Sequence, residues 1–141
     1  MTMRYALGAA VVAVLGLSAP TARADAAAEQ AAQAGAASWL ALVDQQKYAE
    51  SWDQAAKLFK GAVTKEQWQS AAAGARGPLG KLISRKLKSS QYTEKLPGAP
   101  DGRYVVIQYD AVFERKAQAV ETVTPMADPD GAWRVSGYFI R

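Results

Sequence analysis

The sequence predicts an α+β fold in which N-terminal helices pack on a four-stranded antiparallel sheet. Apolar residues recur every three or four positions between residues 25 and 77, and every second position in much of the rest of the chain. Short connections separate the last three predicted strands, which makes these strands antiparallel neighbours. Consecutive helices followed by consecutive strands place the helices on one face of the sheet.

Residues 1–24 have the pattern of a secretory signal peptide. Arg4 supplies a positive charge, the uncharged run Tyr5–Leu17 follows, and Ala22-Arg23-Ala24 is a small-x-small cleavage pattern. The run Tyr5–Leu17 is 13 residues long, which is shorter than the roughly 20 residues that span a bilayer. We therefore expect cleavage after Ala24 and a single mature domain, residues 25–141, in the periplasm or outside the cell, with no stable membrane span.

The composition excludes several kinds of site. The 141 residues include no Cys and no His, which excludes a thiol nucleophile, a zinc–thiolate site, a Ser-His-Asp triad and an imidazole ligand. Without residues 1–24 the chain keeps 15 basic and 13 acidic residues, since Arg4 and Arg23 are lost. So small a net charge is a weak guide to partners. We expect no cofactor and no metal, because Asp128 and Asp130 lack the ligand count of a calcium loop.

Three helices are predicted before residue 80. The first covers residues 25–46, and the second is short and ends at Lys60-Gly61. Thr64 followed by Gln67 has the pattern of a capping box at the start of the third, which Gly77 and Pro78 end. Each helix has an apolar stripe at helical spacing: Ala32, Ala36, Trp39 and Val43; Tyr48, Trp52, Ala55 and Phe59; Trp68, Ala71, Ala72 and Ala75.

Four strands are predicted in the second half: Leu82–Tyr92, Tyr104–Phe113, Ala117–Met126 and Trp133–Ile140. The alternation of apolar residues is clearest in Tyr104–Phe113. Asp130-Gly131 is a hairpin-turn signal before the last strand. Strict alternation in that strand places Val135 and Phe139 on one face and Tyr138 on the other.

Several segments in both halves carry a family resemblance: Trp39-Leu40-Ala41-Leu42-Val43-Asp44, Ser84-Arg85-Lys86-Leu87, Leu96–Gly102, Tyr104–Tyr109, Glu121–Thr124 and Asp130–Ile140. In this order they resemble the bacterial domain-of-unknown-function family 4019, over nearly all of the mature chain. The arrangement also resembles the nuclear-transport-factor-2-like, cystatin-like group, which implies helices laid in a curved sheet as a cone. Enzymes of that group use Asp with His or Tyr, and this chain has no His. The group hosts dehydratases, isomerases and interaction domains, so the fold alone does not choose among them.

Two carboxylates of the strand half are candidate catalytic groups, Glu121 and Asp110. Glu121 falls in the middle of a predicted strand, where it is either a general base or the partner of Arg85 or Arg134 on an adjoining strand. We expect the structural pair, because cross-strand pairs of this kind are common. Asp110 falls on the polar face of its strand, and we expect it to face solvent.

Aromatic and basic residues supply the candidates for binding. Tyr109 and Trp133, with Arg85, are the candidate residues of a ligand pocket in the cone, although most of the aromatics are expected in the core. A basic run also marks the first predicted strand: Lys81, Arg85, Lys86, Lys88 and Lys95. Since no nucleic-acid module accompanies this run, we expect no nucleic-acid partner and interpret Lys86 and Lys88 as protection of a sheet edge.

Three functional hypotheses follow. The favoured one is a non-catalytic binding or interaction domain of the bacterial cell envelope, whose partner is a small molecule or an envelope protein. The second is a small-molecule isomerase or dehydratase, which requires Glu121 or Asp110 to face an apolar cavity without an ion-pair partner. The third is a homodimer whose sheets pack face to face, and it requires four exposed residues: Tyr104, Val106, Val112 and Tyr138.

Overall fold

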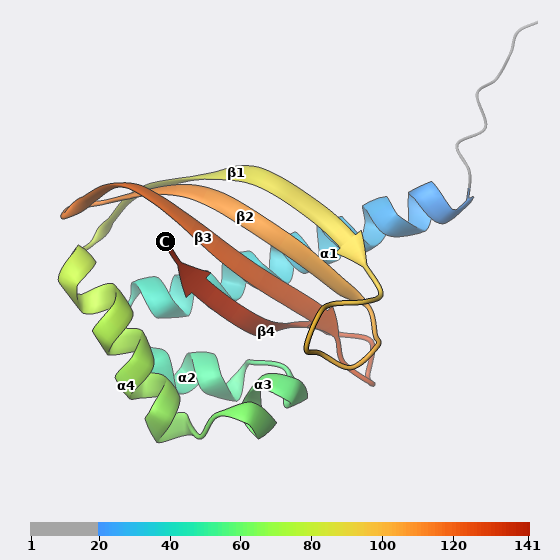
Figure 1. The fold of residues 1–141 in the computed structure, drawn as a ribbon, viewed down its shortest axis with the longest axis horizontal. Coiled ribbons are helices and arrows are strands. Elements are labelled where there is room, and N and C mark those ends of the chain that lie inside the picture. Colours follow the sequence, from blue (N-terminus) through green and yellow to red (C-terminus); the bar gives the residue numbers. More distant parts are fainter. Residues whose placement is uncertain (1–19) are drawn as a thin grey trace, which may run out of the picture.

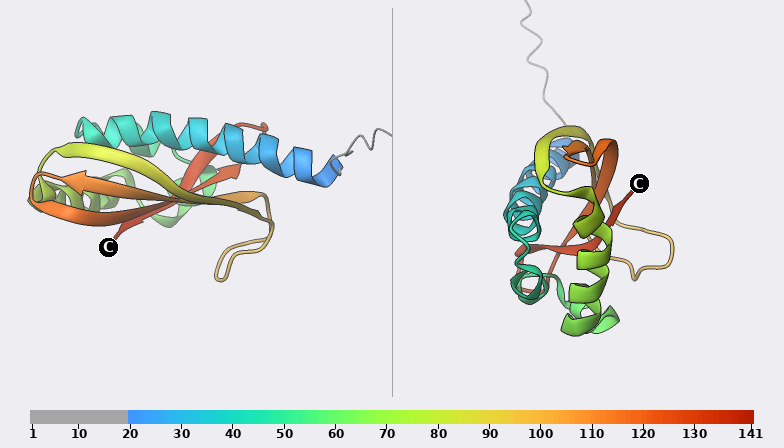
Figure 2. Two further views of the ribbon diagram at one scale, coloured as in Figure 1. Left: turned by 90° about the horizontal axis from the view of Figure 1, so that it is seen from above. Right: turned by 90° about the vertical axis from the view of Figure 1, so that its left-hand side faces the viewer.

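The structure is a computed structural model, and it describes residues 20–141. A four-stranded antiparallel sheet carries one long helix, α1 (Pro20–Asp44), along one face, and three short helices pack beside its last strand (Figure 1). Seen from above, α1 runs along most of the length of the sheet (Figure 2). The predicted signal peptide, residues 1–24, lies outside the described residues except for its last five, which belong to α1.

The short helices are α2 (Tyr48–Asp53), α3 (Lys57–Ala62) and α4 (Lys65–Arg76), and a single 3-10 turn, Gly77–Leu79, follows them. The predicted capping box is confirmed. Thr64 Oγ1 accepts the Gln67 backbone N–H at 3.1 Å, and Gln67 Oε1 accepts the Thr64 backbone N–H at 2.9 Å. This reciprocal pair satisfies two backbone donors that the first turn of a helix leaves free.

The prediction of one helix from Tyr48 to Gly61 is wrong, because the chain forms α2 and α3 with a break between them. At the break Ala56 is extended, with φ −62° and ψ 153°. Its backbone N–H donates to the Val135 carbonyl at 2.8 Å. In a continuous helix this N–H would donate to a carbonyl one turn earlier in the chain. The bond to Val135, at the edge of the sheet, replaces that intrahelical bond.

The strands are β1 (Leu82–Thr93), β2 (Tyr104–Phe113), β3 (Lys116–Ala127) and β4 (Trp133–Ile140), hydrogen-bonded in chain order. The α+β prediction and the four strands are thus confirmed. Each pair of strands contains at least one register shift, and bulges of this kind bend a sheet. Figure 2 shows the bend. Lys86 and Lys88 are exposed on β1, which is an edge strand as expected.

A register shift also makes the alternation predicted for β4 wrong. Thr124 pairs with Gly137 and Pro125 pairs with Val135, so Ser136 is an extra residue in β4. The shift turns both Val135 and Tyr138 toward the helices, whereas Phe139 is 58% exposed. Tyr138 therefore belongs to the core, which the sequence pattern alone did not predict.

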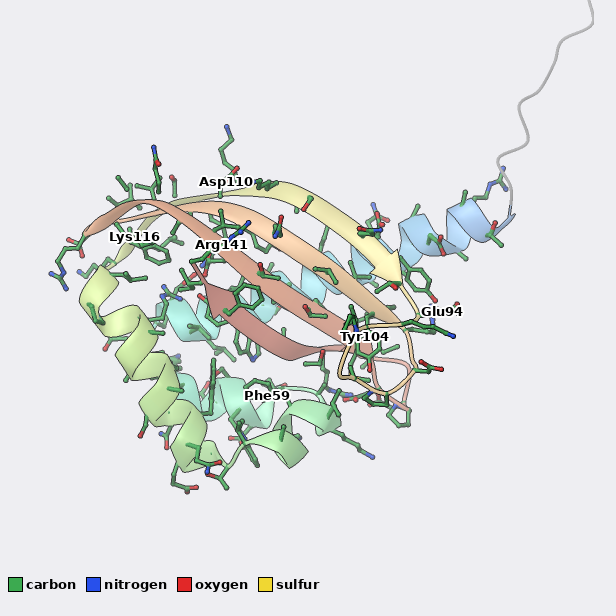
Figure 3. All side chains as sticks on the ribbon, viewed as in Figure 1. Phe59, Glu94, Tyr104, Asp110, Lys116 and Arg141 are labelled. Carbon is green, nitrogen blue, oxygen red and sulfur yellow. The ribbon has the colours of Figure 1, made fainter. Side chains whose placement is uncertain are left out.

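An aromatic cluster fills the space between α1, the short helices and β4. Its members are Trp39, Phe59, Trp68 and Tyr138, with ring centroids 5.0–6.4 Å apart; Figure 3 labels Phe59 among the short helices. Ser51 of α2 satisfies both buried indoles: its carbonyl accepts Trp39 Nε1–H at 2.9 Å, and its hydroxyl accepts Trp68 Nε1–H at 2.8 Å. These bonds fix both rings, since a buried indole N–H needs an acceptor.

The stripe predicted for α4 is correct at Trp68 and Ala72, which are buried, and wrong at Ala71 and Ala75, which are exposed. The buried residue one turn after Ala72 is Arg76, which is 5% exposed. A charged side chain on the buried stripe of a helix requires partners inside the protein.

Candidate functional site

Glu121, in the middle of β3, is fully buried and both of its carboxylate oxygens accept hydrogen bonds. Arg85 donates from Nε to Oε1 at 2.6 Å and from Nη2 to Oε2 at 3.2 Å. The hydroxyl of Tyr138 also donates to Oε2. Arg85 is one of the two arginines expected as its partner, but it lies on β1 and reaches across β2 instead of coming from the adjoining strand.

The same Arg85 guanidinium joins the sheet to the end of α1. Its Nη1 and Nη2 donate to the two carboxylate oxygens of Asp44 at 2.8 and 2.9 Å. Arg76, the last residue of α4, donates from Nη2 to Asp44 Oδ1 at 2.8 Å. We call Asp44, Arg76, Arg85, Glu121 and Tyr138 the ion network; it connects α1, α4, β1, β3 and β4.

Hydrogen bonds and neighbouring charges in the ion network favour the charged forms of Asp44 and Arg85 and the protonated form of Tyr138. Burial raises the pKa of the Asp44 carboxyl, but hydrogen bonds and charges of Arg85 and Arg76 outweigh burial and hold that pKa below its ordinary value of 3.8. Burial lowers the pKa of Arg85, and its bonds to Asp44 and Glu121 more than reverse this, so that its pKa is raised. Burial and the charge of Glu121 both raise the pKa of Tyr138, which stays a protonated donor.

In this geometry both carboxylate oxygens of Glu121 are used by partners within the protein. A general base needs a free lone pair within reach of the proton it removes. Glu121 has no exposed surface and already accepts three hydrogen bonds. The requirement of the enzyme hypothesis, an inward carboxylate without an ion-pair partner, is therefore not met at Glu121.

We expect the contribution of Asp44 to stability to depend on pH. Because its pKa is lower in the folded state than in the unfolded chain, the contribution is complete above about pH 3.8 and is lost as the pH falls through the lower folded-state value. Asp44→Asn should thus be less stable than the wild type at neutral pH, and the difference should shrink below pH 3.8. Urea unfolding at a series of pH values measures this. A difference that stays constant down to pH 2 would contradict it.

Two other candidate residues, Asp110 and Tyr109, lie on opposite faces of β2. Asp110 is exposed on the outer face, 3.9 Å from Lys88 Nζ, and lies far from the short helices (Figure 3). Tyr109 is buried on the helix side, and burial raises the pKa of its hydroxyl. The charge of Arg85 lowers this pKa and that of Glu121 raises it by less, so the net rise comes from burial. Tyr109 thus lies beside the ion network and not in an open pocket.

Trp133, the third pocket candidate, lies apart from Arg85 and Tyr109. It lines a groove between α1, α2 and the start of β4, with a volume of about 420 Å³, which we call the Trp133 groove. Its other lining side chains include Leu42, Ser38, Glu50 and Gln54. The predicted three-residue pocket is therefore divided between two places, because strand order puts Arg85 and Trp133 on elements at opposite edges of the sheet.

Close backbone packing forms one wall of the Trp133 groove. A Cβ atom placed on Gly35 of α1 would lie 2.8 Å from the Trp133 carbonyl oxygen. Only glycine therefore lets α1 approach β4 this closely. Arg134, also in the lining, already donates to Asp128 and Asp130 at 2.8–2.9 Å.

Asp44 and Arg76 were not among the site residues predicted from the sequence. Arg76 was detectable, because it continues the spacing Trp68, Ala72 by one further turn on the buried face of α4. Asp44 carried no such signal, since an acidic residue at the end of a helix is ordinarily solvated.

Neither a metal-ligand cluster nor a membrane-spanning helix is found in the part of the chain that the structure describes. Within residues 20–141 no three residues of the types His, Cys, Asp and Glu are grouped so as to hold a metal ion. No helix among the same residues is both long enough and apolar enough to cross a membrane.

Comparison with known proteins gives one match. A family profile described as a protein of unknown function (DUF4019) matches residues 35–138. No curated protein and no solved structure matches the chain. The matched range includes Gly35, all of the ion network and the residues of the Trp133 groove.

Proposed function

Since the chain belongs to the DUF4019 family of proteins of unknown function, we propose its function from its own geometry: it is a non-catalytic, exported domain of the bacterial cell envelope that binds a small amphipathic molecule in the Trp133 groove. Export is supported by the sequence pattern of residues 1–24.

The observation that carries the proposal is the Trp133 groove itself. Its volume of about 420 Å³ is within the usual range of small-molecule sites, and it combines apolar side chains with a few polar groups, as such sites do. Among its charged residues, Arg134 is occupied by Asp128 and Asp130, whereas Glu50 is exposed at the rim. A ligand with an apolar body and a hydrogen-bond donor or positive charge fits this lining.

Two alternatives are less well supported by the same geometry. An isomerase or dehydratase would need a reachable carboxylate in an apolar cavity, but Glu121 is enclosed by Arg85 and Tyr138, and Asp110 faces outward. A face-to-face dimer requires four exposed residues, Tyr104, Val106, Val112 and Tyr138, and the two valines are partly buried. Tyr104 is 1% exposed and Tyr138 packs in the aromatic cluster, so neither is available on the outer face.

Native mass spectrometry of the protein recovered from the periplasm after expression of the full chain tests the proposal. We expect the mass of a chain whose first residue is Asp25, together with a small molecule that the protein retains. Trp133→Ala and Glu50→Gln should each lose this molecule, because the first removes apolar contact and the second removes the negative charge of the carboxylate. Phe139→Ala, which removes an exposed aromatic from the opposite face of the same strand, should retain it.

An unliganded wild-type mass, or a molecule retained by both groove variants, would count against binding in the Trp133 groove. A mass that still includes residues 1–24 would count against export. Circular dichroism of Trp133→Ala separates loss of the ligand from loss of the fold, and Glu50→Gln changes only an exposed side chain.

A further inference from the structure

A second recess lies on the other side of the end of α1, next to the ion network. Its volume is about 220 Å³, and we call it the Arg76 cleft. Charged and polar side chains of its lining come from the end of α1, from α4 and from the segments that flank the sheet: Asp44, Gln46, Arg76, Lys81, Glu114 and Arg115. We propose that the Arg76 cleft binds a single oxyanion group, a carboxylate or a phosphate.

The first support is the incomplete bonding of Arg76. Its side chain is 5% exposed and its guanidinium lies over the Phe113 ring, with Cζ 4.7 Å from the ring centroid. Only Nη2 is bonded, to Asp44. Its Nε and Nη1 are buried and have no acceptor among the described residues. Buried polar groups in proteins nearly always have a partner, and charged donors are the most costly to leave without one.

The second support is that Asp44, the acidic residue bonded to Arg76, is already matched by two arginines. Asp44 accepts two hydrogen bonds from Arg85 in addition to the one from Arg76. Glu114 Oε1 accepts the backbone N–H of Lys81 at 2.6 Å. Asp44 is therefore not free to neutralise a further cation at the cleft, whereas Glu114 forms no ion pair with any residue from 20 to 141 and remains an acidic group in the lining.

The rim of the cleft presents two more cations. Arg115 donates from Nε and Nη2 to the carbonyls of Pro78 and Gly77 at 2.9 and 3.2 Å, so its guanidinium is held in place by neutral acceptors. Lys81 is exposed, and its ammonium forms no ion pair with any residue from 20 to 141. Fixed guanidinium groups beside an ammonium group are the arrangement that recognises oxyanions.

The backbone conformation of Gln46 is a further support for the proposal. It has φ +61° at the end of α1, a conformation that glycine adopts at far lower cost. A long amide side chain is thus kept at a strained position on the wall of the cleft. Its amide N–H₂ is a further donor for an oxyanion, which gives a reason for glutamine at this place.

Titration with inorganic phosphate and, separately, with acetate tests the proposal. The probe is the Nε–Hε NMR signal of Arg76, assigned by its absence in Arg76→Lys, with sodium chloride of equal ionic strength as the control. We expect saturable shifts with at least one oxyanion and none with chloride. Saturation by phosphate alone identifies a phosphate group, and saturation by acetate as well identifies a site that also accepts carboxylates.

Variants of the rim locate the binding. Arg115→Gln and Lys81→Gln should each weaken the saturating oxyanion about tenfold, the usual effect of one charged hydrogen bond. Lys88→Gln removes the same charge from an exposed position on β1 and should leave the affinity unchanged. Gln46→Gly should raise the urea midpoint and yet weaken binding, a combination that a purely structural role would not produce.

Shifts that rise linearly without saturation, or that are equal in chloride, would overturn the proposal. So would an unchanged affinity in both Arg115→Gln and Lys81→Gln, because the anion would then bind elsewhere. The result is independent of the Trp133 groove, which shares no lining residue with the Arg76 cleft.

Discussion

Glu121→Gln is expected to lower the free energy of unfolding by about 3–5 kcal/mol, the usual cost of removing one partner of a buried ion pair. The fully buried carboxylate of Glu121 accepts bonds from Arg85 and Tyr138, and the amide cannot neutralise the Arg85 guanidinium. Urea unfolding at pH 7 measures the loss. Domains are typically stable by 5–15 kcal/mol, so the variant should be close to unfolding.

Asp110→Asn is the matched control for this experiment. It makes the same chemical change at an exposed position of the neighbouring strand, where we expect an effect within about 0.5 kcal/mol. If Glu121→Gln were as stable as Asp110→Asn, the ion network would not hold the fold together. That result would return Glu121 to the list of candidate catalytic residues.

Gly35→Ala is expected to destabilise the protein by about 1–3 kcal/mol, the range for overpacking. The added Cβ would lie 2.8 Å from the Trp133 carbonyl oxygen, which is backbone and cannot rotate away. Helix α1 must then move from β4, and Trp133 moves with it. We expect the same variant to lose the molecule retained in the Trp133 groove, as measured by native mass spectrometry.

Gly74→Ala provides the control, since it places the same methyl group on helix α4 where nothing lies within 4 Å. There alanine should stabilise by about 0.5–1 kcal/mol, its ordinary advantage over glycine in a helix. If the free energy of unfolding falls in Gly35→Ala and rises in Gly74→Ala, the effect at Gly35 comes from close packing and not from helix propensity. A stabilising Gly35→Ala would show that α1 does not depend on close approach to β4.

The sequence was sufficient for the parts of the fold that rest on periodicity. Strands β2 and β4 have the expected bounds, and the stripe Ala32, Ala36, Trp39 and Val43 is buried. The capping box of α4 is a local interaction, and it was predicted correctly for that reason. The family resemblance was confirmed over residues 35–138.

The remaining features depend on contacts between distant segments. The break before α3 exists because Ala56 bonds to Val135, and no property of residues 54–56 alone reveals that partner. The extra residue Ser136 in β4 reverses the faces of the residues after it. Because of that reversal, the sequence analysis placed Tyr138 on the outer face and did not connect it to Glu121.

The ion network also has a consequence for the order in which the chain folds. Asp44 and Arg85 are 41 residues apart in the sequence, and Arg85 and Glu121 are 36 apart. A partly assembled chain, with the helices formed and β3 still unpaired, would hold Arg85 next to Asp44 and Arg76 without its second anion. In this partly folded state the charge of Arg85 lacks one of its two anionic partners, which makes the state unstable. We therefore expect the helical half and the strand half of the chain to become stable together.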